Sequence, residues 1–156
     1  MAWNEKLLKL STSAIEPYVG NYLVENRQNA KEYIPATDYE DKVLKIDLYI
    51  VSNDNIKCPV QVKTRERDSE NFSLSEKDIK TEQENRVFAF VDKTFSSDIV
   101  DKLSVMDIED VKELLKNENP HVYLCSQKQL LNGKFEEKIK NGSSYYLIPK
   151  TFLTRI

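Results

Sequence analysis

Three polar side chains interrupt two apolar runs between residues 45 and 64, and their types could together bind a cation. Asp47 stands in the first run, and Gln61 and Lys63 stand in the second. A carboxylate and an amide carbonyl are oxygen ligands of the kind that Mg²⁺ prefers. Ionised groups on a partly buried sheet are costly unless they are paired or bound to metal. The residue types therefore indicate a site for a divalent cation.

The two runs have the composition of a β-hairpin, because β-branched and aromatic residues flank a group of turn formers. A turn centred on Asp54 would set Asp47 directly opposite Gln61, with Cβ atoms roughly 5 Å apart. Side chains alternate across a strand, so we expect Asp47, Gln61 and Lys63 to project from one face into one pocket. The two strands are VLKIDLYIV (43–51) and IKCPVQVKT (56–64).

An Asp on one strand, followed after a turn by a strand with acid-x-Lys, resembles the PD-(D/E)xK nuclease superfamily. IDLYIV and VQVKTR are most similar to its Holliday-junction-resolvase-like branch, whose members often have IDL and VEVKTR. Glu16, followed by Tyr22 and Leu23, also resembles the acid-plus-YL pattern of that branch's first helix. The resemblance covers about residues 13 to 65 and reaches the VFAFV segment loosely. Gln61 departs from the usual Asp or Glu, although some members carry Gln-x-Lys.

The resemblance implies a metal-dependent nuclease that hydrolyses phosphodiester bonds, with DNA as the expected nucleic acid and a homodimer left open. Mg²⁺ (or Mn²⁺) would be held by Asp47, by Gln61 Oε1 and by the backbone carbonyl of Val62. Glu16 would bind a metal-bound water, and Lys63 would position the nucleophile or stabilise the transition state.

Two other hypotheses compete with a nuclease. Because Gln61 brings no charge to a metal, the chain could be a catalytically degenerate nuclease-fold module that binds nucleic acid or a protein partner. Alternatively, the segment 98–119, with seven acids and three lysines, docks a protein partner, and the polar hairpin residues are incidental. In that case Lys63 is a surface residue of an edge strand, and Asp47 is an ion-pair partner of Lys63 or Lys45.

The helix acid has alternatives as well. Ser13 and Glu16 have the spacing of a capping box, so Glu16 is equally well explained as part of a helix cap. Glu25 is the next choice, but nine residues at 100° each put it on the opposite side of the helix. Asp38 and Asp41 precede the Asp47 strand and are less favoured metal acids.

The pattern of elements predicts an α/β fold with a central mixed sheet flanked by helices, and one domain over 1–156. The resemblance makes its core restriction-endonuclease-like. We expect the helix at 13–27 to lie against the Asp47 strand, and Ser73 with Glu76 to cap a helix within 72–86. The other predicted helices span 96–104 and 107–120, and the other predicted strands span 32–36, 86–92, 121–125 and 144–149.

Composition excludes several classes of protein. The chain has 156 residues, of which 31% are charged, and a net charge of -3, which argues against a broad nucleic-acid-coating protein. No apolar run approaches the roughly 20 residues that span a bilayer, and the first residues do not resemble a signal peptide. Two cysteines and one histidine make a disulfide framework or a zinc site improbable. We therefore expect a cytoplasmic protein without membrane contact.

Overall fold

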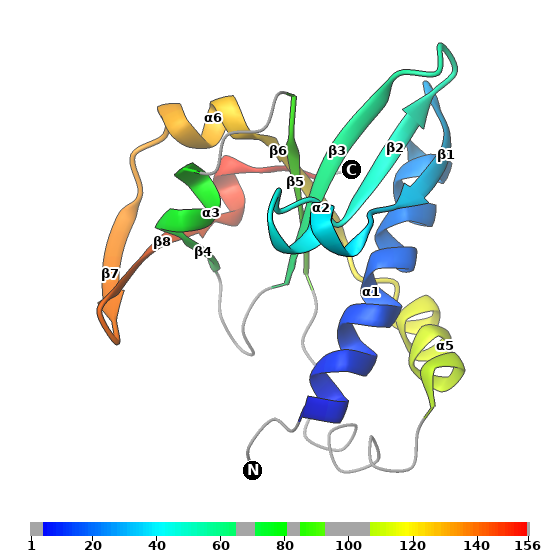
Figure 1. The fold of residues 1–156 in the computed structure, drawn as a ribbon, viewed down its shortest axis with the longest axis horizontal. Helices are drawn as coiled ribbons and strands as arrows, with labels where there is room; N and C mark the ends of the chain where they lie inside the picture. The colour runs from blue at the N-terminus through cyan, green and yellow to red at the C-terminus, as the bar shows by residue number, and fades with distance from the viewer. Residues whose placement is uncertain (1–4, 65–70, 81–84, 93–106, 156) are drawn as a thin grey trace.

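The molecule contains two β-sheets (Figure 1). The structure, a computed structural model, describes residues 5–64, 71–80, 85–92 and 107–155, with the backbone alone for 5–13 and 118. The main sheet consists, in spatial order, of β1 (Ala30–Pro35), β2 (Leu48–Ser52), β3 (Lys57–Thr64), β5 (Val87–Val91), β6 (Val122–Ser126) and β9 (Thr154–Arg155). The second sheet consists of β4 (Asn71–Ser75), β8 (Ser143–Pro149) and β7 (Glu136–Lys140).

The main sheet is mixed, because β3 and β5 are parallel and its other neighbouring strands are antiparallel. The helices that accompany the sheets are α1 (Glu5–Asn26), α2 (Asp38–Lys42), α3 (Glu76–Lys80), α5 (Ile108–Glu118), α6 (Gln127–Asn132) and the 3-10 turn η1 (Lys150–Phe152). The predicted central mixed sheet flanked by helices is therefore confirmed. Among the described residues, no helix has both the length and the apolar character needed to cross a bilayer.

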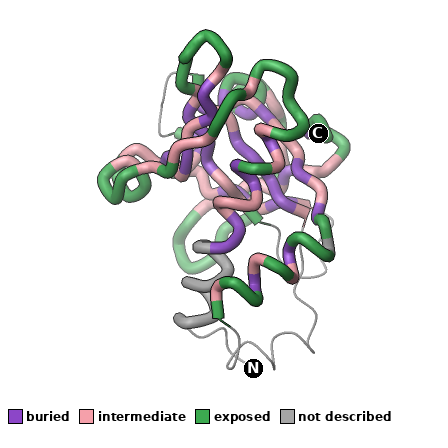
Figure 2. Tube along the Cα trace, turned by 90° about the vertical axis from the view of Figure 1, so that its right-hand side faces the viewer, coloured by how far each residue is buried: buried purple, intermediate pink, exposed green. Residues whose placement is uncertain are grey.

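Apolar side chains pack on both faces of the main sheet, and the buried segments gather along its strands (Figure 2). The alternation along β5 shows the division. Ala89 and Val91 belong to the cluster that α1 and α5 cover. Phe88 and Phe90 belong to the cluster on the opposite face, which β4, β8, α3 and α6 cover. The main sheet is thus the middle layer of three.

Helix α1 lies against β2, as predicted, but it begins earlier than the sequence indicated. Val19 and Leu23 of α1 share a buried cluster with Leu48 of β2. The helix starts at Glu5, so Ser13 lies inside it and the predicted cap at Ser13 is wrong. The predicted start at Ser13 rested on the capping-box spacing of Ser13 and Glu16, which does not mark the beginning of this helix.

The hairpin has the register that the sequence predicted. Leu48 pairs with Val60, and Val51 pairs with Lys57, which centres the turn on Asp54. The regular ladder begins at Leu48, one residue after Asp47. That residue's N–H donates to the Val60 carbonyl at 2.9 Å, which is one position out of step with the ladder.

The segment after the hairpin differs from its prediction. Residues 72–75 were expected to begin a helix, but they lie in β4, where Phe72 and Leu74 are buried. The helix that follows, α3, begins at Glu76, and its cap is the hydroxyl of Ser75, which accepts from the N–H of Asp78 at 3.1 Å. The predicted box at Ser73 is therefore wrong, because period-two burial prevails over a capping spacing in this segment.

The second sheet contains the β7–β8 hairpin, of which the sequence pattern predicted the strand at 144–149 but not β7. β7 is exposed along its whole length, and β7 with its turn to β8 projects from the rest of the molecule (Figure 1). Asn141 and Gly142 both have positive φ at the turn, as a tight hairpin connection requires. The helix predicted at 107–120 is confirmed as α5, whereas the one predicted at 96–104 lies outside the described residues.

Candidate metal centre

Asp47 lies where the chain enters β2, and the neighbouring strand holds its carboxylate. Lys45, two residues earlier, has a left-handed backbone with φ 57°, so the chain turns sharply there. Oδ2 of Asp47 accepts a hydrogen bond from the backbone N–H of Val62 at 2.7 Å. Backbone N–H groups of a strand lie close to the plane of its sheet. The carboxylate is therefore held at the edge of β3 that faces β2.

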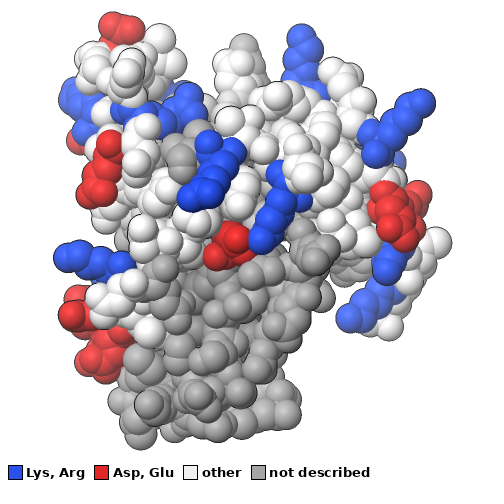
Figure 3. Space-filling model, turned by 180° about the vertical axis from the view of Figure 1, so that it is seen from behind, with Lys and Arg blue, Asp and Glu red and all other residues white. Residues whose placement is uncertain are grey.

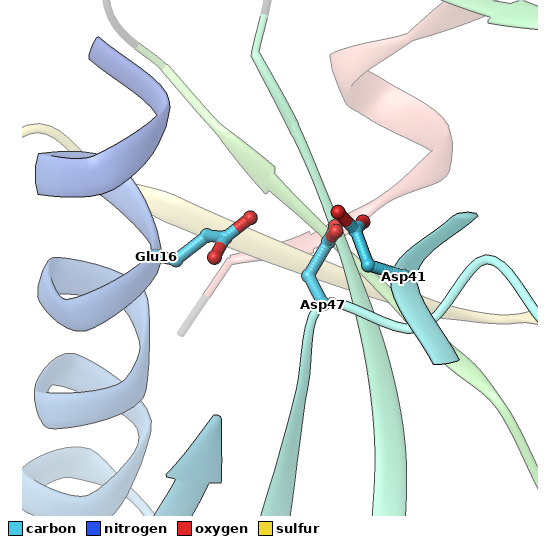
Figure 4. A group of neighbouring side chains, drawn as sticks. All are labelled: Glu16, Asp41 and Asp47. Carbon is cyan, nitrogen blue, oxygen red and sulfur yellow. The ribbon is translucent and has the colours of Figure 1, made fainter. Parts of the chain in front are cut away.

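Glu16 reaches the same place from α1. Ile15 and Val19 are buried and seat one face of α1 on the main sheet. Adjacent helical residues are 100° apart, so Glu16 lies at the margin of that buried face and is half-buried. Figure 4 shows its side chain directed from α1 toward Asp47.

Asp41 lies on α2, a short helix with a capped first turn and a side-chain contact to β2. The helix begins with a capping box, in which the Thr37 hydroxyl accepts from the Glu40 N–H and the Glu40 carboxylate accepts from the Thr37 N–H. The hydroxyl of Tyr49 in β2 donates to the other oxygen of Glu40. These contacts anchor the short helix beside the strand that Asp47 precedes.

The three carboxylates converge from three separate elements (Figure 4). One ligand oxygen from each of Glu16, Asp41 and Asp47 lies within 4.8 Å of the others. Carboxylate oxygens are hard ligands of the kind that Mg²⁺, Mn²⁺ and Ca²⁺ accept. The group therefore has the donor chemistry of a divalent-cation site.

Burial and mutual repulsion make this group electrostatically costly. Burial is the largest cause that raises the pKa of Asp47 to about 8; a hydrogen bond with Asp41 contributes to the rise, and the Val62 N–H opposes it. Burial also raises the pKa of Glu16, and the nearby charge of Asp41 adds to that effect. A bound cation would relieve the same repulsion that otherwise favours a retained proton.

Gln61 and Lys63 do not share these contacts. Gln61 is 5% exposed, and its Oε1 accepts from Nη1 of Arg86 at 3.1 Å. Lys63 Nζ forms an ion pair with Asp78 of α3 at 2.7 Å. Each of the two side chains therefore binds a partner other than the Asp47 carboxylate, and one common pocket for all three stays a prediction.

The physical reason is the position of Asp47 relative to the ladder. Val60 and Val62 pack toward α1, so alternation along β3 sends Gln61 and Lys63 to the opposite face of the sheet. Asp47 precedes the regular part of β2, and its carboxylate lies along the strand edge. The period-two rule could not place a residue that lies outside the ladder.

The backbone of Val62 remains beside the acidic group. Its N–H already contacts Asp47, and in a strand the N–H and C=O of one residue point toward the same neighbouring strand. The Val62 carbonyl therefore faces the side on which Asp47 lies. Its role as a metal ligand stays a prediction.

The two alternative acids lie elsewhere. Glu25 is exposed on α1 and lines a pocket with Tyr18 and Lys112, between α1 and α5. Asp38 is exposed in the first turn of α2 and is outside the group of converging carboxylates. Of Glu16 and Glu25, only Glu16 joins Asp47 in the acidic group. Of Asp38 and Asp41, only Asp41 does so.

Sequence reasoning missed three polar residues on the opposite face of the main sheet. Arg86 is 1% exposed, Gln127 is 6% exposed, and Asp78 is the partner of Lys63. An available signal was a charged residue at the head of the apolar VFAFV strand. Its partners were not predictable, because they come from β3, α3 and α6.

Comparisons with known proteins give one structural likeness. No protein-family model matches the chain, and no curated protein matches it. The chain is similar to the solved structure of D212, a nuclease from a fusselovirus, with 16% sequence identity and a TM-score of 0.47. The match covers 99% of this chain and 89% of that chain.

Proposed function

We propose that the chain is a metal-dependent nuclease that hydrolyses phosphodiester bonds in DNA and has a restriction-endonuclease-like core of the PD-(D/E)xK type. The observation that carries the proposal is the convergence of Glu16, Asp41 and Asp47, whose ligand oxygens lie within 4.8 Å of one another. They converge where the chain enters β2 of the mixed sheet, which agrees with the motif at IDLYIV and VQVKTR.

The residues present suit Mg²⁺ or Mn²⁺. Asp47 and Glu16 would hold the ion, with the Val62 carbonyl as a neutral ligand and Asp41 as a third carboxylate. A divalent cation bound there would lower the pKa of a water molecule and neutralise charge on the phosphate. The amide of Gln61 is the weakest member of the predicted set, because Arg86 already binds its oxygen.

Lys63 supplies a cation on the strand that borders the acidic group. Burial would raise the pKa of Asp78, but its hydrogen bond with the Lys63 ammonium lowers it overall, so the ion pair persists at neutral pH. We propose that Lys63 stabilises the negative charge of the phosphate. Its side chain is 26% exposed, which leaves it accessible from solvent.

The proposed substrate contact is local. On the face shown in Figure 3, Lys and Arg side chains are dispersed and interleaved with acidic ones. The net charge of -3 agrees with that distribution. We therefore propose that binding depends on the metal and a few contacts at the site rather than on a broad basic surface.

One observation favours the second candidate, a degenerate nuclease-fold module that binds nucleic acid or a protein. Position 61, where the superfamily usually has an acid, carries an amide whose oxygen accepts from a buried guanidinium. A fixed positive charge beside a cation site weakens cation binding. The two candidates differ in whether the acidic group binds a metal ion tightly enough for the protein to cleave DNA.

The test is cleavage of branched, double-stranded and single-stranded DNA with Mg²⁺ or Mn²⁺, alongside metal binding followed by calorimetry. We expect cleavage that chelator abolishes and that Asp47→Ala and Lys63→Ala each reduce at least a hundredfold. Glu16→Gln and Asp41→Asn should each weaken Mn²⁺ binding about tenfold, because each removes one charge from the group.

Two isosteric variants serve as matched controls. Asp38→Asn removes an acid from the same short helix as Asp41, and Glu25→Gln removes one from the same helix as Glu16. Both should cut and bind Mn²⁺ like the wild type. Cleavage that survives Asp47→Ala would place the site elsewhere. DNA binding without cleavage or Mn²⁺ uptake would leave the degenerate module as the function.

A further inference from the structure

Arg86 is a buried cation with no place in the sequence prediction. It precedes β5, is 1% exposed, and lies over the ring of Phe88 with its guanidinium carbon 4.6 Å from the ring centre. Burying a guanidinium is costly unless its N–H groups are satisfied. Its contacts therefore indicate what the fold uses it for.

The guanidinium contacts several separate segments of the chain. Nη1 donates to Gln61 Oε1 at 3.1 Å and to the Lys45 carbonyl at 3.3 Å. Nη2 donates to the carbonyl of Asp78 at 2.6 Å. Nε donates to Gln127 Oε1 at 3.1 Å. A planar fork of five N–H donors can satisfy such a set at once, which an ammonium group cannot reproduce.

Three of these contacts lead to residues that the sequence motif singled out. Lys45 has φ 57° and stands two residues before Asp47, so its carbonyl anchors the turn that delivers that carboxylate. Gln61 is held directly. Asp78, whose carbonyl Arg86 binds, holds the ammonium of Lys63 through its own carboxylate.

We propose that Arg86 is a positioning residue of the candidate metal centre, which fixes the turn before Asp47, the carboxamide of Gln61 and, through Asp78, the ammonium of Lys63. The inference rests on the proposed function for its consequence in metal binding and cleavage, but the geometry that it describes exists without metal. It also explains an amide at position 61: a neutral acceptor satisfies Arg86 without cancelling its charge.

The decisive variant is Arg86→Lys, which keeps the positive charge and loses the fork. The first measurement is hydrogen exchange of the Val62 amide, since this N–H is bound to the Asp47 carboxylate. We expect Val62 to exchange at least tenfold faster in Arg86→Lys, while the amides of buried β5 stay within twofold of wild type. The second measurement is Mn²⁺ binding, where the dissociation constant should rise about tenfold.

Arg27→Lys is the matched control, because Arg27 is an exposed arginine beyond the end of α1 and the substitution is the same. It should change neither measurement. For cleavage, Arg86→Lys should lower kcat and leave KM for DNA within twofold, since the surface that meets DNA is intact. If Arg86 had a merely structural role, Arg86→Lys would lower the stability of the protein without lowering kcat selectively relative to KM.

A second variant keeps the test decisive if Arg86→Lys fails to fold. Gln61→Glu places a carboxylate beside Arg86, which should hold it, so Mn²⁺ affinity should stay within threefold of wild type and Val62 exchange should not change. A gain of tenfold or more in Mn²⁺ affinity would show that residue 61 reaches the cation freely and would overturn the inference.

Two further results separate this inference from the proposed function. Wild-type protein that neither binds Mn²⁺ nor cuts DNA would defeat the proposed function, and Val62 exchange would still decide the role of Arg86. Unchanged Val62 exchange and Mn²⁺ affinity in a folded Arg86→Lys protein would defeat the Arg86 inference alone.

Discussion

At the scale of single residues, the acidic group is a source of instability unless something compensates its charge. Glu16 and Asp47 both have raised pKa values, and burial is the largest cause for each. The Val62 N–H is a partial compensation, since one hydrogen bond cannot offset the loss of water around a carboxylate. The stability of the protein should therefore report directly on the ionisation of this group.

The first prediction concerns stability and pH in the absence of metal. The ordinary pKa of Asp47, 3.8, applies to the unfolded chain, and its folded value is about 8. Between these values the folded state retains a proton that the unfolded state has lost. The free energy of unfolding should therefore fall as pH rises from about 4 to about 8, and then level off. Urea denaturation at a series of pH values, in chelator, measures this.

Asp47→Asn supplies the comparison, because an amide has the same shape and does not ionise. Its free energy of unfolding should lose most of the decline between pH 4 and 8, because only the contribution of Glu16 remains, and Asp38→Asn should retain the full decline. Parallel pH profiles for wild type and Asp47→Asn would show that Asp47 is not the group that retains the proton.

Residue identities in the site were predictable where local spacing determines them. Asp47 and Glu16 were found from a motif and a helical pattern, and the structure brings them together. The partners of Gln61 and Lys63 were not predictable, because Arg86 and Asp78 reach them across the sheet from other parts of the chain. Local spacing in a sequence does not indicate which distant side chain will form a hydrogen bond or an ion pair with a given residue.

At the scale of elements, the short helix α2 decides whether the acidic group has three members or two. Five residues are too few for a helix to be stable by itself, so its position depends on its cap and on the Tyr49 contact with Glu40. Asp41 is exposed, so packing does not fix the position of its side chain.

The second prediction is therefore that the cap of α2 matters to metal binding. Thr37→Ala removes the hydroxyl that accepts from Glu40 N–H, and it should cost about 1 kcal/mol of stability. It should also raise the Mn²⁺ dissociation constant roughly threefold to tenfold, because Asp41 loses its fixed position. Calorimetry and thermal unfolding measure the two effects.

Ser126→Ala is the matched control, since Ser126 heads the same kind of capping box at α6. Its loss should cost a similar free energy and leave Mn²⁺ affinity unchanged. Equal losses of Mn²⁺ affinity in both variants would mean that the effect arises from general destabilisation.

Elements were predicted best where burial and turn chemistry agree. The hairpin register followed from its turn residues and apolar alternation, and the structure confirms it. Both capping boxes proposed from Ser13 and Ser73 are wrong, because Ser and Glu three residues apart occur by chance inside helices and strands. The box that matters to the site begins at Thr37, in a segment whose apolar residues were too few to indicate a helix.

At the scale of the whole molecule, the acidic group depends on how closely α1 approaches the main sheet. A Cβ at Gly20 would lie 2.5 Å from the ring of Tyr33 in β1, which is closer than real contacts allow. Glycine at this position lets the helix and the edge of the sheet meet. The same contact sets the distance from Glu16 to the carboxylates that lie beside β2.

The third prediction tests this dependence with Gly20→Val. Overpacking against Tyr33 should cost about 2 kcal/mol, and displacement of α1 should weaken Mn²⁺ binding at least fivefold. Gly142→Val is the control: it has open space but φ 79°, so it should lose roughly 1–2 kcal/mol to backbone strain alone. Calorimetry should show normal Mn²⁺ affinity in that control, and a shared loss would contradict the prediction.

The parallel pair of β3 and β5 has a consequence for how the chain folds. β1, β2 and β3 pair in the order in which they follow along the chain, whereas Val60 meets Val87 only after the chain has passed through β4 and α3. Closing that longer loop costs more entropy, so the crossover should set the folding rate. If folding stops before β3 pairs with β5, β3 remains an open edge, and Gln61 has not yet bound Arg86. Such an edge pairs readily with another copy, so aggregation during refolding should compete with this one step.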